Sequence, residues 1–189
     1  MAAHDATSRS ASVVAPATRP GVGLEAGAAR AVFTWEGDRW SHTVTMAGGA
    51  PKAVPQPDAA VAWRSLDGPW PEDGDPRWPA SPVLVELSRM DGTDGGPAIL
   101  GVGMAGRSHF SASIVRDPRV ADAVRFEIAC RLHDGPGWLG STYRHGPRLV
   151  RIEAGSGEGG LPRTVVWSYS LGPQGIFGVV GATVSTPKA

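Results

Sequence analysis

The chain of 189 residues has a single cysteine and no asparagine, and lysine occurs only at Lys52 and Lys188. One cysteine excludes an intramolecular disulfide and a zinc site made of several thiolates. No apolar run approaches the roughly 20 residues needed to cross a bilayer, and the N-terminus has no apolar segment typical of a secretion signal. We therefore expect a soluble, cytoplasmic protein in which Cys130 is a small buried hydrophobic residue.

Charge of one sign is also lacking, because 18 basic side chains are balanced by 18 acidic ones. Without a basic block the chain has no electrostatic surface for nucleic acid. It also has no polybasic amphipathic segment that could lie on a membrane. We therefore expect the protein to bind neither nucleic acid nor a membrane.

Glycine and proline are abundant, at 26 and 17 residues, while hydrophobic residues make up 41% and include seven tryptophans. Such a composition is typical of a turn-rich globular domain. Residues 1–30 hold few large apolar side chains, too few to offset the entropy of ordering them. We expect a disordered tail over 1–30 and one domain over 31–185.

Period-two alternation between turn signals predicts an all-β fold without helices. The clearest hairpin spans 31–46, with its turn at Glu36-Gly37-Asp38. Further strands are predicted at 83–88, 98–103, 108–115, 124–131, 148–153, 164–170 and 176–184. Strands at this spacing favour a single antiparallel β-sandwich or a flattened barrel.

A long proline-rich and tryptophan-rich loop is predicted between residues 47 and 82, where prolines interrupt any regular element. Trp63, Trp70 and Trp78 are spread along it. Two interpretations stay open: the indoles pin the loop over a sheet edge, or they form an aromatic surface that faces a ligand. A second copy of the chain could instead cover the edge, so a homo-oligomer also stays open.

The motif Gly101-Val-Gly103-Met-Ala-Gly106 matches the glycine pattern of dinucleotide-binding folds. That fingerprint needs a helix at its third glycine, whereas the sequence here continues as an alternating strand. The following Ser108 and His109 are adjacent in that strand, so they point to opposite faces and cannot act as a nucleophile and its base. The sequence therefore predicts no nucleotide cofactor and no serine hydrolase.

A polar surface is expected where the strands flanking Pro118 pair. Their alternation places His109, Ser111 and Glu127 on one face of the sheet, with Phe110 and Phe126 on the core face. A register about Pro118 that sets Ser111 opposite Glu127 brings His109 within diagonal-neighbour distance of the glutamate.

This polar face can be the ordinary solvated side of a half-buried sheet, and as a functional surface it leaves two functions open. In the preferred one, a non-catalytic binding or interaction module takes a small polar or carbohydrate ligand. In the alternative, an enzyme uses Glu127 and His109 as a general acid–base pair, with Arg107 or Arg131 holding an anion. Ser111 belongs to the ligand surface in either case.

The segment from Leu132 to Arg144 is predicted to be a loop that carries further ligand contacts. These candidates are His133, Trp138, Tyr143 and Arg144. The two aromatic rings could stack on a sugar or plug the end of the sandwich. Because the spacing of the histidines fits no common ligand pattern, we predict no metal site.

Two phrases of the sequence, Gly101-Val-Gly-Met-Ala-Gly-Arg-Ser-His-Phe-Ser-Ala-Ser113 and Leu139-Gly-Ser-Thr-Tyr143, are similar to bacterial proteins of unknown function. The resemblance covers the chain from Phe33 onward. It implies no activity, fold, cofactor or site residue.

Overall fold

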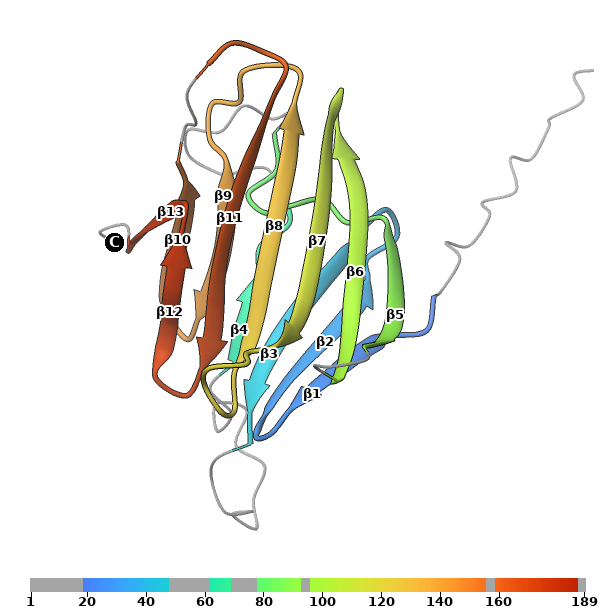
Figure 1. Ribbon diagram of the computed structural model, residues 1–189, viewed down its shortest axis with the longest axis vertical. Coiled ribbons are helices and arrows are strands. Elements are labelled where there is room, and N and C mark those ends of the chain that lie inside the picture. The colour runs from blue at the N-terminus through green and yellow to red at the C-terminus, as the bar shows by residue number, and fades with distance from the viewer. Residues whose placement is uncertain (1–18, 48–61, 69–77, 93–95, 156–158, 187–189) are drawn as a thin grey trace, which may run out of the picture.

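The computed structural model describes residues 19–47, 62–68, 78–92, 96–155 and 159–186. In these ranges the chain forms thirteen β-strands and no helix, so no helix there could cross a membrane. The strands make two antiparallel sheets that pack against each other (Figure 1). The predicted all-β sandwich is confirmed, and the sheets do not close into a barrel.

The two sheets differ in size and in the order of their strands. The seven-stranded sheet has the order β1-β2-β3-β4-β9-β10-β13, and the six-stranded sheet has the order β12-β11-β8-β7-β6-β5. The first comprises β1 (Val22–Ala26), β2 (Ala29–Trp35), β3 (Trp40–Met46), β4 (Ala62–Ser65), β9 (Gly140–His145), β10 (Arg148–Ala154) and β13 (Ala182–Ser185). The second comprises β5 (Glu86–Gly92), β6 (Gly96–Ala105), β7 (Ser108–Arg116), β8 (Val124–Leu132), β11 (Arg163–Gly172) and β12 (Gly175–Val180).

The core lies between the sheets and follows the predicted alternation. Phe110 and Phe126 point inward and are 3% and 2% exposed, beside the fully buried Phe33 of the facing sheet. Cys130 is buried in the same layer, where burial raises the pKa of its thiol to about 12. The cysteine therefore behaves as a core residue.

The predicted domain boundary at Ala31 is wrong, because β1 pairs with β2 and buries Leu24 and Ala26 completely. Residues 1–18 of the expected tail lie outside the described residues. Strands β4 and β9 form where loops were expected. The expected strand 176–184 is divided at Gly181, where the chain passes from the six-stranded to the seven-stranded sheet.

The predicted strand 83–88 begins only at Glu86, and the residues just before it enter the core. Val83 and Leu84 are buried between the sheets, and the Leu84 carbonyl accepts a hydrogen bond of 2.8 Å from the Trp40 amide. They pass directly beneath two glycines of β6. A Cβ on Gly103 would lie 2.0 Å from the Val83 carbonyl oxygen, whereas a Cβ on Gly101 would meet only leucine side chains at 3.0 Å.

The indoles of the predicted proline-rich loop, residues 47–82, face into the protein where the structure describes them. Trp63 in β4 is 5% exposed and stacks on His145, with ring centroids 4.1 Å apart. Trp78 is half-buried and packs near Phe110. Trp70 lies outside the described residues. The two described rings contribute to packing and do not form an exposed aromatic surface.

A chain of hydrogen bonds crosses the core from one sheet to the other. His42 Nε2 lies 2.8 Å from the Tyr143 hydroxyl, which lies 2.7 Å from the Tyr169 hydroxyl. The backbone amide of His42 donates to Ser65 Oγ, which donates to Asp67 Oδ2. Because these polar groups satisfy one another, they can be buried among aromatic rings without leaving unpaired atoms along the chain of bonds.

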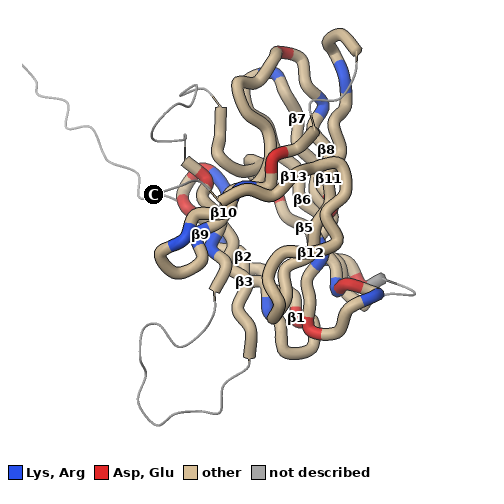
Figure 2. Tube along the Cα trace, turned by 90° about the vertical axis from the view of Figure 1, so that its left-hand side faces the viewer, with Lys and Arg blue, Asp and Glu red and all other residues tan. Residues whose placement is uncertain are grey.

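The last three strands carry a single charged side chain, Arg163, at the start of β11. No Asp, Glu, Lys or Arg occurs from Thr164 to Thr186, a run that includes almost all of β11 and the whole of β12 and β13. The charged residues are concentrated elsewhere along the trace (Figure 2).

Candidate ligand-binding site

The outer face of the six-stranded sheet carries the polar surface expected from the sequence. His109, Ser111 and Glu127 point outward from β7 and β8, while their neighbours Phe110 and Phe126 point into the core. Ser108 is fully buried, so it lies on the face opposite to His109. The predicted division of residues between the two faces is correct.

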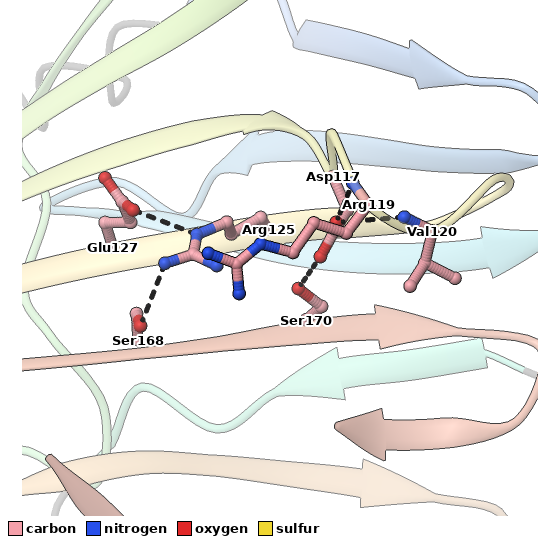
Figure 3. A network of polar contacts seen from close by, with 7 residues as sticks. All are labelled: Asp117, Arg119, Val120, Arg125, Glu127, Ser168 and Ser170. Carbon is pink, nitrogen blue, oxygen red and sulfur yellow. Dashed lines mark hydrogen bonds and ion pairs between the residues drawn. The ribbon is translucent and has the colours of Figure 1, made fainter. Parts of the chain in front are cut away.

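The predicted register between β7 and β8 is wrong by two residues. Glu127 lies opposite Ser113, and His109 lies opposite Arg131. The cause is the connection between the strands, which is longer than a turn centred on Pro118. Asp117 Oδ1 accepts hydrogen bonds from the amides of Arg119 and Val120, and Asp117 Oδ2 accepts one from Ser170 (Figure 3).

This register keeps the expected acid–base pair apart. His109 and Glu127 are separated by four residues along the sheet, which corresponds to roughly 13 Å. Glu127 instead accepts a hydrogen bond of 2.9 Å from Arg125 Nε, and Arg125 also reaches Ser168 (Figure 3). The carboxylate is thus held in a surface ion pair and does not converge with the imidazole.

A depression of about 480 Å³ lies on this face near the ends of β7 and β8. Its centre is low because two small side chains, Ser111 and Ala129, lie opposite each other. We call this depression the trough; it is lined by Val85, Glu86, Val102, Gly103, Met104, His109, Phe110, Ser111, Ala129, Arg131 and Thr164. Its volume is in the range typical of small-molecule sites.

Hydrogen-bonding groups converge on one end of the trough. His109 and Arg131 are cross-strand neighbours, and Arg131 NH1 lies 3.4 Å from Thr164 Oγ1. The His133 ring is 6.0 Å from the His109 ring. Arg107 is exposed in the β6–β7 turn. The structure thus brings five predicted ligand residues to one end of one sheet face: Arg107, His109, Ser111, Arg131 and His133.

The other three predicted ligand residues lie elsewhere. Tyr143 has no exposed surface and belongs to the core network, so its predicted contact with a ligand is wrong. Arg144 is exposed on the outer face of the seven-stranded sheet, where it lies opposite Arg64. Trp138 is half-buried in the β8–β9 connection, close to Gly140. No single ligand surface combines these residues with His109.

Sequence reasoning missed the part of the trough contributed by strands other than β7 and β8. Glu86, Val102 and Met104 line one side, and Thr164 lines the other. For Val102 and Met104 the signal was the β6 sequence, whose outward residues are apolar. Their position next to Ser111 and His109 depends on the register of β5, β6 and β7, which the alternation alone does not fix.

The described surface has other hollows besides the trough. A larger one, of about 830 Å³, lies beside the β7–β8 connection and is lined by residues that include Glu25, Arg116 and Arg119. Another lies near Arg19 and Trp40. Neither contains a residue predicted from the sequence to bind a ligand, whereas the trough contains His109, Ser111 and Arg131.

Across the described ranges, no three histidine, cysteine, aspartate or glutamate side chains lie together in a way that could hold a metal ion. The trough has a histidine and a glutamate but no third group of this kind among its lining residues. Its groups are suited to hydrogen bonding and to contact with an anion.

Comparison with known proteins adds no relative: no family model, curated protein or solved structure matches the chain.

Proposed function

We propose that the protein is a non-catalytic binding module whose outer sheet face takes a small polar ligand in the trough. The observation that carries this proposal is the convergence of an imidazole, a hydroxyl and a guanidinium, from His109, Ser111 and Arg131, around a hollow with apolar walls. A few polar groups in a mostly apolar concavity is the usual composition of a small-molecule site.

Binding is preferred to acid–base catalysis because His109 and Glu127 do not meet. A general acid and base must both reach the reacting atoms within hydrogen-bonding distance, and the register separates these two by roughly 13 Å. A carbohydrate is a less suitable ligand than a small polar molecule with an ionised group, because neither Trp138 nor Tyr143 lies in the trough to stack on a sugar ring.

A thermal-shift screen of sugars, organic acids and nucleotides tests the proposal, with Ala129→Leu as the blocking variant. The leucine side chain would fill the centre of the trough. A ligand present at a hundred times its dissociation constant should stabilise the parent protein by about 2.7 kcal/mol. We expect that gain to disappear in Ala129→Leu.

Ala98→Leu is the matched control, because Ala98 is half-buried in the same sheet but does not line the trough. It should bind as the parent does. A ligand that stabilises Ala129→Leu as strongly as the parent would show that the site lies elsewhere, and the absence of any hit would reject the proposed function.

A further inference from the structure

The outward side of β6 is apolar throughout. The strand has the sequence Gly-Pro-Ala-Ile-Leu-Gly-Val-Gly-Met-Ala, with no polar side chain in ten residues. Leu100, Val102 and Met104 face outward, with exposures of 39%, 48% and 51%. We call these three residues the apolar stripe. A strand that is apolar on both faces is typical of one covered on both faces.

The apolar stripe leads directly to the cationic end of the trough. Met104 lies opposite His109, which lies opposite Arg131. Among the residues that the structure describes, Arg131 forms no ion pair, and its guanidinium makes a polar contact only with Thr164. A guanidinium without a carboxylate partner, next to exposed aliphatic side chains, is complementary to a ligand that has an anionic head and an apolar body.

The lone acidic side chain of the trough limits the charge of that head. Glu86 lies opposite Val102 and therefore borders the trough on the β5 side. It disfavours a dianion more strongly than a monoanion, because the repulsion between like charges grows with the charge of the ligand. A carboxylate therefore fits better than a phosphate, and it matches the two-pronged geometry of the Arg131 guanidinium.

We propose that the ligand of the trough is a monocarboxylate with an alkyl chain, held by Arg131 and His109 at its head and lying along the apolar stripe. The inference rests on the proposed function and specifies its ligand class. From Met104 to Leu100 the stripe covers four residues, or roughly 13 Å, which accommodates an alkyl chain of medium length.

Three probes separate the contributions of head and tail: octanoate, 1-octanol and propionate, titrated into the full chain and followed by calorimetry and NMR. Octanoate has both parts, octanol lacks the charge, and propionate lacks most of the tail. We expect octanoate to bind at least about tenfold more tightly than either of the others, since each loses one of two sets of contacts.

Two variants with matched controls locate these contacts. Arg131→Gln should weaken octanoate binding by about tenfold and leave octanol unaffected, because it removes only the charged hydrogen bonds. Val102→Ser should weaken the binding of both octanoate and octanol, because it removes an apolar contact with the alkyl chain. The controls are Arg144→Gln on the other sheet and Val184→Ser, whose parent side chain is 46% exposed against 48% for Val102. Neither control should change binding.

Several results would overturn the inference. If propionate binds as tightly as octanoate, the apolar stripe does not contact the ligand. If octanol binds as tightly as octanoate, the carboxylate does not contribute to binding. A dimer in light scattering that Val102→Ser dissociates would assign the stripe to a second copy, and binding only to anionic vesicles would assign it to a membrane surface. If octanoate fails but another ligand binds in a manner sensitive to Ala129→Leu, the ligand class is wrong and the proposed function stands.

Discussion

Replacing His42 with glutamine is expected to remove the loss of stability that protonation of this buried residue causes below pH 6.5. Burial lowers the pKa of His42 from 6.5 to about 3, because charging the ring would leave an ion among Phe33, Phe126 and Tyr143. The unfolded chain takes up this proton near pH 6.5 and the folded chain only near pH 3. The neutral His42 therefore makes its full contribution to the free energy of unfolding above pH 6.5. This contribution falls by roughly 5 kcal/mol as the pH decreases from 6.5 to 3.

Asp67 contributes with the opposite sign. Burial raises the pKa of its carboxyl to about 6, although the Ser65 hydrogen bond and the Arg39 charge act in the other direction. The stability that this group adds is present below pH 3.8 and is lost as the pH rises to 6, in total roughly 3 kcal/mol. Between pH 4 and 6 the two groups nearly cancel, so their combined effect on stability is almost flat.

Urea unfolding at a series of pH values should resolve the two contributions. Relative to the parent, His42→Gln should gain stability steadily as the pH falls from 6.5 to 3, whereas Asp67→Asn should gain it as the pH rises from 4 to 6. A constant offset between variant and parent would report lost packing alone. Parallel profiles for His42→Gln and the parent would show that His42 is not the acid-sensitive group.

The second large effect is expected from Gly103→Ala. The added Cβ would lie 2.0 Å from the Val83 carbonyl oxygen and 3.0 Å from the Leu84 Cα, and backbone atoms cannot move aside as a flexible side chain does. Either β6 or the segment under it must shift. We expect a loss of about 3 kcal/mol or more in the free energy of unfolding, at the upper end of overpacking effects.

Gly101→Ala is the control for this substitution, because it adds the same methyl group two residues away on the same face of β6. Its neighbours would be the flexible ends of Leu84 and Leu87 at 3.0 Å. We expect the free energy of unfolding to change by no more than about 1 kcal/mol. Replacing glycine in a strand is favourable for backbone entropy, and this gain offsets the cost of displacing the two leucine side chains. Equal destabilisation by the two substitutions in urea unfolding would contradict the proposed close approach at Gly103.

The behaviour of Gly101 and Gly103 also shows what sequence reasoning could reach. The sequence correctly predicted that a strand, and not a helix, follows the third glycine of the motif. The reason for the glycines was not accessible, because it is the passage of Val83 and Leu84 beneath the strand. The sequence instead predicted a strand over 83–88. It contained no information that the strand begins only at Glu86 and that the residues before it enter the core.

The sequence predicted which side chains of the candidate site share the outer face of the sheet, but not which of them are neighbours across the strands. Period-two alternation is unchanged by a register shift of two residues, so it placed His109, Ser111 and Glu127 on the outer side correctly. The register depends on how Asp117 closes the connection, which no alternation encodes. Tyr143 was misplaced for a related reason: β9 is buried on both faces, so its sequence does not alternate.

The passage of the chain at Gly181 affects how the native state opens. Strand β12 borders one layer and β13 the other, and between them Gly181 has a φ of 67° and lies close to the Val166 carbonyl. The C-terminal strands therefore connect an edge of one sheet to an edge of the other. Peeling away the final strand loosens both layers together, so amide protons of β12 and β13 should exchange with solvent as one cooperative unit.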